Sequence, residues 1–226
     1  LIEKELQFLG ETLKDPEHAF VAILGGAKVS DKIGVIENLI GKVDRIVIGG
    51  GMAYTFLKGR GKSIGNSLCE NDFVDKGQDL LKQAADAGCD VLLPPDHNVV
   101  RELKPHADHR TAVGDIDSGF LAVDLGPMAI EKFCEKIVDA KTIVWNGPMG
   151  VFEMEPFDEG TKAVAEAVAE ATDNGAKSII GGGDSASAIK KLGLEDRVSH
   201  ISTGGGASLE FLEGKKFVCL EILDEK

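Results

Sequence analysis

The sequence has little of what several classes of protein require. Its four cysteines, Cys69, Cys89, Cys134 and Cys219, have no paired spacing, so neither a disulfide framework nor a zinc site is predicted. Aromatic residues make up 5% of the chain, and 25 basic residues stand against 38 acidic ones. The resulting net charge of −13 argues against binding to nucleic acid or to an acidic membrane. No signal peptide or membrane-length hydrophobic run is found, so a reducing cytoplasm is the expected compartment. A first residue of Leu1 rather than Met suggests a piece of a longer product.

The chain is rich in glycine, with 28 among 226 residues, and 43% of its residues are hydrophobic. This length suffices for a buried core, and no linker or repeat divides it, so one domain is expected. Short hydrophobic runs predict strands at residues 20–24, 45–48, 91–93, 120–125, 141–145, 178–180 and 198–201. Helical spacing predicts helices at residues 2–14, 33–40, 52–58, 71–87, 127–138, 161–172 and 184–192, with a short helix after residue 206. The polar segment 97–117 is left without an assigned element.

Strands that alternate with helices at this spacing indicate a doubly wound, Rossmann-like α/β fold of three layers, with helices on both faces of a parallel sheet. Glycine clusters follow four of the predicted strands. They lie at residues 25–26, 49–51, 181–183 and 204–206. In an open parallel sheet these turns share the edge at the carboxyl ends of the strands, where ligands bind. The recurrence predicts a ligand site along that edge.

The most informative of these turns is the stretch 178–185, in which a strand passes through three glycines into a helix that opens at Asp184. A helix entered through glycines presents unpaired backbone N–H groups and the positive end of its dipole, which together favour an anion. A carboxylate at this position suits a metal ion bound to phosphate. The alternative is that Asp184 only caps the helix.

Two lysines and one glutamate extend the prediction. Lys28 and Lys32 lie four residues apart around the start of a helix, where cations oppose the dipole unless a phosphate accepts them. The alternative is two solvated surface lysines. Glu153 follows the turn at 146–150, and a carboxylate there can accept both hydroxyls of a ribose. Its alternative is a solvated loop carboxylate.

Two further patterns carry no site. Residues 59–63 have the sequence GRGKS, which resembles the end of a Walker A loop, but Phe56 stands where that motif needs glycine, and a predicted helix precedes it instead of a strand. The histidines His97, His106 and His109 make no metal-binding pattern, and we expect them on the surface.

Five motifs resemble those of the phosphoglycerate kinases, in that family's order and over nearly the whole chain. They are GGAKVSDK at 25–32, GGGMAYTF at 49–56, WNGPMGVFE at 145–153, GGGDSA at 181–186 and SHISTGGGASLE at 199–210. The resemblance is to the carboxyl-terminal, nucleotide-binding half of the family. It implies that residues 1–226 form this one domain, beginning at the interdomain helix 2–14, and that the amino-terminal substrate domain is absent.

The resemblance also implies a role for individual residues. Lys32 would contact the nucleotide phosphates, Lys28 the phosphoryl group in flight, and Asp184 a magnesium ion. Asn146 would reach toward the phosphates, and Glu153 would bind the ribose. The residues implied to line the phosphate tail are Gly182, Gly183 and Ser185. Those implied to enclose the adenine are Gly26, Ala27, Gly51, Leu68, Val123, Pro148 and Val151. Those implied to bind the transferred phosphoryl group through their amides are Gly204, Gly205 and Gly206.

The implied reaction is reversible phosphoryl transfer between 1,3-bisphosphoglycerate and MgADP, which gives 3-phosphoglycerate and ATP in glycolysis. We expect the chain to bind ADP or ATP as a monomer but to be inactive alone, because the basic residues that bind the triose phosphate belong to the missing domain. One alternative is a small ATP-dependent kinase that is complete in itself. The other is a Rossmann-like nucleotide-binding or interaction module without catalysis.

Overall fold

The structure is a computed structural model that describes residues 15–202 and 212–214. The predicted helix 2–14, the cluster Gly204, Gly205 and Gly206, and the short helix after it lie outside these residues.

A six-stranded parallel sheet forms the middle layer. Its strands are β1 (Phe20–Leu24), β2 (Arg45–Ile48), β3 (Asp90–Leu92), β7 (Thr142–Asn146), β8 (Lys177–Gly181) and β9 (His200–Ile201). They lie in the order β3-β2-β1-β7-β8-β9, and every neighbouring pair is parallel. The chain builds the sheet outward from β1 in one direction and from β7 in the other. The order therefore reverses between β1 and β7, and in such sheets the crevice at that point binds ligands.

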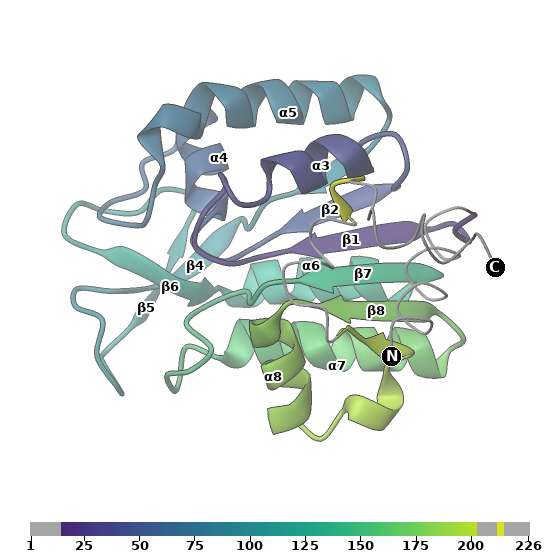
Figure 1. The fold of residues 1–226 in the computed structure, drawn as a ribbon. Helices are drawn as coiled ribbons and strands as arrows, with labels where there is room; N and C mark the ends of the chain where they lie inside the picture. Colours follow the sequence, from purple (N-terminus) through teal and green to yellow (C-terminus); the bar gives the residue numbers. More distant parts are fainter. Residues whose placement is uncertain (1–14, 203–211, 215–226) are drawn as a thin grey trace.

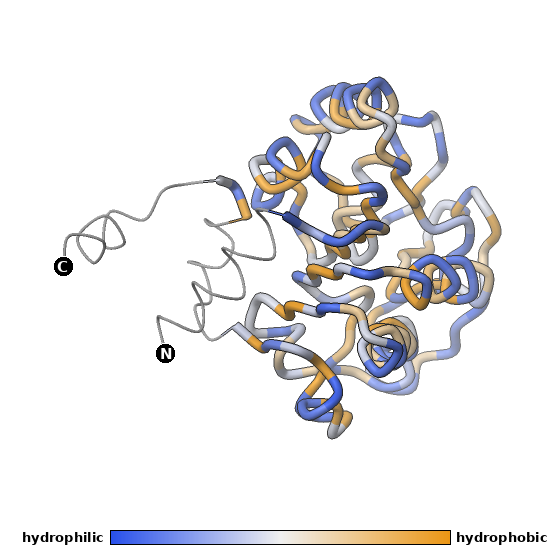
Figure 2. Tube along the Cα trace, turned by 90° about the vertical axis from the view of Figure 1, so that its right-hand side faces the viewer, coloured by the Kyte–Doolittle hydropathy of each residue, from blue (hydrophilic) through white to orange (hydrophobic). Residues whose placement is uncertain are grey.

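Helices cover both faces of this sheet, as predicted, and Figure 1 shows them above and below the strands. One layer contains α3 (Ile33–Leu39), α4 (Ala53–Gly59) and α5 (Val74–Asp86), and the other contains α6 (Pro127–Val138), α7 (Glu159–Asp173) and α8 (Gly183–Lys191). Strand β1 is buried on both sides: Phe20, Ala22 and Leu24 join the core of the first layer, while Val21 and Ile23 join that of the second. This two-residue alternation is what a strand between two helix layers requires. Figure 2 shows the hydrophobic stretches along the inner strands and hydrophilic positions on the outer turns of the helices.

A second sheet departs from the prediction. Strands β4 (Asp96–Val100), β5 (Arg110–Val113) and β6 (Leu121–Leu125) form an antiparallel sheet in the order β5-β4-β6. The sequence pattern predicts no element for the segment 97–117 and places residues 120–125 in the parallel sheet. Strands β4 and β5 have no clear hydrophobic run, because β5 is mostly exposed and β4 begins with the polar residues Asp96, His97 and Asn98.

The prediction that His97 lies on the surface is wrong. His97 is fully buried in β4, where its Nδ1 lies 3.2 Å from the hydroxyl oxygen of Tyr54 in α4. Burial lowers the pKa of His97 to about 4, against the raising effect of Asp96 and of a hydrogen bond to the backbone of Gly114. The partner that makes this burial tolerable comes from a different helix, which no local pattern reveals. His106 and His109 are exposed, as predicted.

Most predicted boundaries agree with the structure to within two residues. The last strand, expected at 198–201, is shortened to β9 because Val198 and Ser199 form a bend that follows the 3₁₀ turn at Glu195–Arg197. Cys69, Cys89 and Cys134 are free thiols, and Cys219 lies outside the described residues. Within residues 15–202 and 212–214, no helix has the length and hydrophobicity to cross a membrane.

Candidate functional site

Two cavities lie side by side at the carboxyl edge of the parallel sheet. The first, of about 350 Å³, contains Lys28 and Lys32, and we call it the lysine cavity. The second, of about 230 Å³, has mainly glycine and hydrophobic residues in its wall, and we call it the hydrophobic cavity. The residues common to both cavities are Gly26, Ala27, Pro148 and Asp184. The two cavities therefore form one continuous site, at the point where the strand order reverses.

Tightly packed glycine turns form the floor between the cavities. Gly147 has a φ of +97°, and a Cβ added to it would lie 2.3 Å from the carbonyl oxygen of Gly25. The turn after β1 is tied to the turn after β7 by a hydrogen bond from Gly26 N to Pro148 O of 2.9 Å. It is tied to the turn after β2 by a bond from Met52 N to Gly26 O of 3.0 Å. Side chains would hold these turns apart, so the glycines are what let three loops meet.

The helix α8 opens onto the lysine cavity, as the stretch 178–185 predicted. Its N-cap is Gly182, with a φ of +84°, and no side chain of the described residues caps the helix. The alternative that Asp184 is a helix cap therefore fails: its exposed carboxylate lies in the first turn and lines both cavities. The backbone N–H groups of this turn have no partner within the helix, which leaves an anion-binding helix end in the wall of the cavity.

Ser185 is placed differently from the other residues of this turn. Its side chain is buried, and its Oγ accepts a hydrogen bond of 2.7 Å from Gly147 N. It lines neither cavity. The hydroxyl therefore joins α8 to the glycine turn instead of pointing toward a ligand.

Lys32 and Asn146 both contribute polar atoms to the wall of the lysine cavity. Lys32 is only 9% exposed, so the alternative of a solvated lysine fails for it, and its ammonium donates a hydrogen bond to Asn146 Oδ1. Burial lowers the pKa of Lys32, while the charges of Asp31 and Asp184 act in the opposite direction. The Nδ2 of Asn146 is buried and has no hydrogen-bond partner within the described part of the chain. A buried cation and an unused amide donor in one cavity favour an anionic ligand. Lys28 lines the same cavity and is exposed.

The hydrophobic cavity brings together the residues expected around a flat group. Val123 comes from β6, Val151 from the loop after β7, and Leu68 from the segment between α4 and η2 (Asn71–Phe73). Leu68 is 60% exposed and packs over Gly51, where an added Cβ would lie 2.8 Å from its Cδ1. Glu153 is exposed and lies in the wall of this cavity.

The structure brings nearly all the predicted residues into the two cavities. In the lysine cavity are Gly26, Ala27, Lys28, Lys32, Asn146, Pro148, Gly182, Gly183 and Asp184. In the hydrophobic cavity are Gly26, Ala27, Gly51, Leu68, Val123, Pro148, Val151, Glu153 and Asp184. Sequence reasoning missed Tyr54 and Asp124, which also line the hydrophobic cavity. An acidic residue inside the hydrophobic run 120–125 was the available signal for Asp124.

The structure gives residues 59–63, the Walker-like sequence GRGKS, no place in either cavity. Residues 59–63 begin at the last residue of α4, and none of them lines either cavity. Among the residues that the structure describes, no group of three or more His, Cys, Asp or Glu side chains could hold a metal ion.

Comparison with known proteins agrees with this geometry. The family model described as phosphoglycerate kinase matches residues 1–215. The phosphoglycerate kinase of Chlorobium phaeobacteroides is 55% identical over the whole chain, which covers 57% of that protein. The structure of phosphoglycerate kinase from Coxiella burnetii is 44% identical with a TM-score of 0.94, and the match covers all of this chain and 57% of that one. The enzyme from Pyrococcus horikoshii is 30% identical with a TM-score of 0.83, over 99% of this chain and 56% of that one.

The chain thus spans about half the length of the relatives that it matches. The chain belongs to the phosphoglycerate kinase family.

Proposed function

We propose that this chain is the nucleotide-binding half of a cytoplasmic phosphoglycerate kinase. The reaction would be reversible phosphoryl transfer between 1,3-bisphosphoglycerate and MgADP, giving 3-phosphoglycerate and ATP. The single observation that carries the proposal is the lysine cavity, in which the buried Lys32 and the unpartnered amide of Asn146 adjoin a hydrophobic cavity. An adenine nucleotide has this division into a flat base and an anionic tail.

The nucleotide lies across both cavities in this proposal. The adenine occupies the hydrophobic cavity between Val123 and Val151, and Glu153 accepts the hydroxyls of the ribose. The phosphate tail extends into the lysine cavity, toward Lys32, Asn146 and the first turn of α8. Lys28, exposed in the same cavity, meets the phosphoryl group as it transfers. The amides of Gly204, Gly205 and Gly206 remain predicted ligands of that group, outside the described residues.

The lysine cavity contains a carboxylate, that of Asp184, which is a suitable ligand for magnesium. The carboxylate of Asp184 is exposed, and it forms no hydrogen bond or ion pair with residues 15–202 and 212–214. One carboxylate without a cluster fits an ion that takes most of its ligands from phosphate oxygens and water. We propose that Asp184 holds Mg²⁺, which when bound neutralises charge on the phosphates.

This chain's own contribution to the reaction is positioning and charge. Among the described residues that line the cavities, none pairs a nucleophile with a base, and in-line phosphoryl transfer needs no such pair. Lys32, Lys28 and the helix N-terminus compensate the negative charge that the transferring group spreads over its oxygens. The floor of glycine turns holds these donors in place before the nucleotide binds.

In this proposal, the triose phosphate is bound by another domain. The basic residues that bind the triose phosphate belong to an amino-terminal domain, whereas residues 1–226 form the nucleotide domain with the interdomain helix at 2–14. We therefore expect a monomeric chain that binds MgADP and MgATP without turning them over.

Calorimetric titration with MgADP tests the nucleotide site. Lys32→Ala should weaken binding by at least about tenfold, because it removes a charge-assisted contact to the phosphates. Asp184→Ala should weaken binding of the magnesium complex. Lys62→Ala is the matched control, since this lysine of the false Walker motif lies outside both cavities. Unchanged affinity in both Lys32→Ala and Asp184→Ala would overturn the site assignment.

An activity assay separates the half-enzyme from its alternatives. The isolated chain, given 1,3-bisphosphoglycerate and MgADP, should form no ATP. Turnover by this chain alone would favour the self-sufficient kinase. Absence of any MgADP binding would favour the interaction module.

A further inference from the structure

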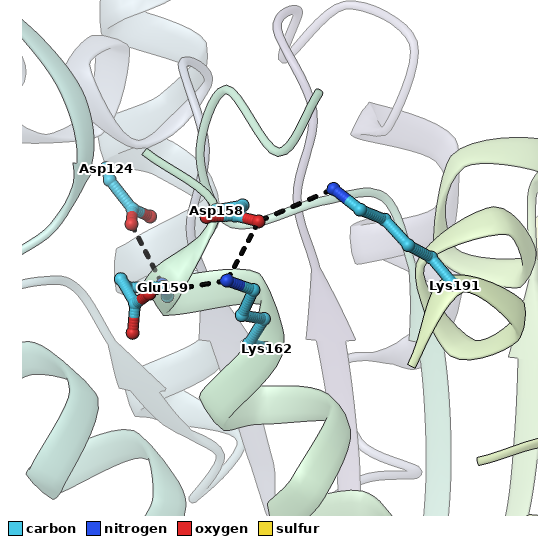
Figure 3. Close-up of polar contacts among 6 residues, drawn as sticks. Asp124, Asp158, Glu159, Lys162 and Lys191 are labelled. Atoms are coloured by element: carbon cyan, nitrogen blue, oxygen red, sulfur yellow. Dashed lines mark hydrogen bonds and ion pairs between the residues drawn. The ribbon is translucent and has the colours of Figure 1, made fainter. Parts of the chain in front are cut away.

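Asp124 is a buried acidic side chain for which the proposed function has no role. It is 2% exposed, lies in β6 and lines the hydrophobic cavity. Its Oδ2 accepts a hydrogen bond of 2.8 Å from the backbone nitrogen of Gly160. Gly160 belongs to the first turn of α7, and Figure 3 shows the Asp124 carboxylate pointing at that turn. The carboxylate therefore lies at the positive end of a helix dipole, which stabilises negative charge.

Two glycines let this carboxylate approach the backbone closely. A Cβ added to Gly150 would lie 2.2 Å from Asp124 Oδ1, and a Cβ added to Gly160 would lie 2.4 Å from the same atom. Any side chain at either position would collide with the carboxylate. Asp124 therefore packs directly against the loop 147–158, and this loop carries Val151 and Glu153.

A backbone hydrogen bond joins the same loop to β6 beside Asp124. Val151 N donates to Val123 O across 2.8 Å. Val123 and Val151 both line the hydrophobic cavity, one from the strand and one from the loop. The spacing of these two walls is therefore set where β6 meets the loop, next to Asp124.

The charges around Asp124 make its burial costly. Burial, together with the charges of Asp158 and Glu159, raises the pKa of Asp124 to about 7, although hydrogen bonds from the backbone of Gly160 and Leu125 act to lower it. Asp158 is itself engaged by Lys162 at 3.1 Å and Lys191 at 3.6 Å, as Figure 3 shows. The charge of Asp124 also acts on Tyr54 of α4, whose pKa burial and this charge together raise. A hydrophobic side chain would avoid this cost but could not bind the first turn of α7.

We propose that Asp124 is a positioning residue for the nucleotide base, because it fixes the loop carrying Val151 and Glu153 at the correct distance from Val123. The inference rests on the proposed function, since it assigns the base to the hydrophobic cavity. Asp124 acts here only through the loop. Its loss should therefore affect a ligand that has a base and spare one that has only phosphates.

Calorimetric titration of the chain with two ligands tests this selectivity. The ligands are MgADP and magnesium tripolyphosphate, which has no base and engages only the lysine cavity. Asp124→Ala should weaken MgADP binding by about tenfold and leave tripolyphosphate binding unchanged. Asp124→Asn keeps an acceptor for Gly160 N and should bind MgADP within about twofold of wild type.

Two further variants control for general damage to the fold. Gly150→Ala pushes the loop away from the intact carboxylate, so it should reproduce the selective loss, and it decides the question if Asp124→Ala does not fold. Asp158→Asn removes a comparably buried carboxylate at the start of α7 that lines neither the lysine cavity nor the hydrophobic cavity, so it should leave both affinities unchanged.

The outcomes distinguish this inference from the proposed function. If wild type binds MgADP and Lys32→Ala weakens it, but Asp124→Ala and Gly150→Ala bind like wild type, the positioning role is overturned and the proposed function stands. Equal weakening of both ligands would also overturn it, because a general loss of structure would then explain the effect. If wild type does not bind MgADP, both proposals fail.

Discussion

Two buried titratable groups should make the stability of this protein respond to pH in opposite directions. His97 has a pKa of about 4 in the folded chain, below its ordinary value of 6.5. As pH falls below 6.5, the unfolded chain takes up a proton that buried His97 refuses, so stability falls. Asp124 has a folded pKa of about 7, above its ordinary 3.8. Its burial favours the protonated form, so its contribution is present at low pH and is lost as pH rises toward 7.

The two effects are nearly equal between pH 7 and pH 5. Each pKa unit corresponds to about 1.4 kcal/mol, and integrating the two proton-binding curves gives about 2 kcal/mol for each group over this range. Acidification from pH 7 to pH 5 lowers the free energy of unfolding by about 2 kcal/mol through His97 and raises it by about 2 kcal/mol through Asp124. In wild type these contributions largely cancel, so removing one group should expose the other.

The assay is urea denaturation at pH 7 and pH 5 for wild type, His97→Phe and Asp124→Asn. Relative to wild type, His97→Phe should become more stable by about 2 kcal/mol on acidification, and Asp124→Asn less stable by about 2 kcal/mol. His97→Phe also leaves the Tyr54 hydroxyl without its partner, which costs about 1–3 kcal/mol at both pH values and cancels in the difference. Asp44 and Glu70, whose pKa values hydrogen bonds hold low, are present in all three proteins. If either variant followed the pH dependence of wild type, the folded chain would not shift the pKa of the group that this variant removes.

Two further predictions concern the floor and the donors of the site. Asn146→Leu should weaken MgADP binding by about tenfold in calorimetry, because it removes both the partner of Lys32 and the free amide in the cavity; wild-type affinity would refute this. Gly147→Ala should lower the free energy of unfolding by more than the roughly 1–2 kcal/mol of left-handed strain, because its Cβ would collide with Gly25 O. Gly175→Ala is the matched control with the same φ of +97° and open space around it, and equal losses in urea denaturation would contradict the collision.

The main sheet and the glycine turns could be predicted because their signals are local. A strand buried on both faces, such as β1, is a continuous hydrophobic run, and each turn beside it carries its own glycines. The same rule that brings the carboxyl ends of parallel strands to one edge gathered Lys28, Asn146 and Asp184 correctly. Sequence spacing was therefore sufficient for these three residues, each of which lies within a few positions of a strand end.

Predictions failed where a residue depends on a partner far away in the chain. The ring of buried His97 forms a hydrogen bond with Tyr54, 43 residues earlier, and the carboxylate of Asp124 accepts one from Gly160 N, 36 residues later. Ser185 turns inward because Gly147 donates to it from another loop. For Lys32 only the alternative of a solvated lysine fails, because this side chain is buried beside Asn146, which is distant in the sequence. No periodicity or motif within a short window contains this information.

The small antiparallel sheet is joined to the main fold by two aspartates that work in the same way. Asp96, in β4, accepts hydrogen bonds from Met128 N at 3.0 Å and Ala129 N at 2.7 Å in the first turn of α6. Asp124, in β6, accepts one from the first turn of α7. In each case a glycine makes room for the carboxylate, since a Cβ on Gly126 would lie 2.3 Å from Asp96 Cγ, as one on Gly150 would collide with Asp124.

This shared device explains why acidic residues occur inside two buried strands. A helix N-terminus has unpaired donors and a positive dipole, and a carboxylate from a neighbouring strand satisfies both at once. The small sheet is thereby fixed to the helix layer on one face of the main sheet, and β6 is held where Val123 completes the hydrophobic cavity. Helix N-termini whose N-cap residue forms no capping side-chain hydrogen bond thus have two different roles in this protein. At α6 and α7 the N-terminus binds an internal carboxylate, while at α8 no side chain in the described part of the chain caps it and it faces the lysine cavity.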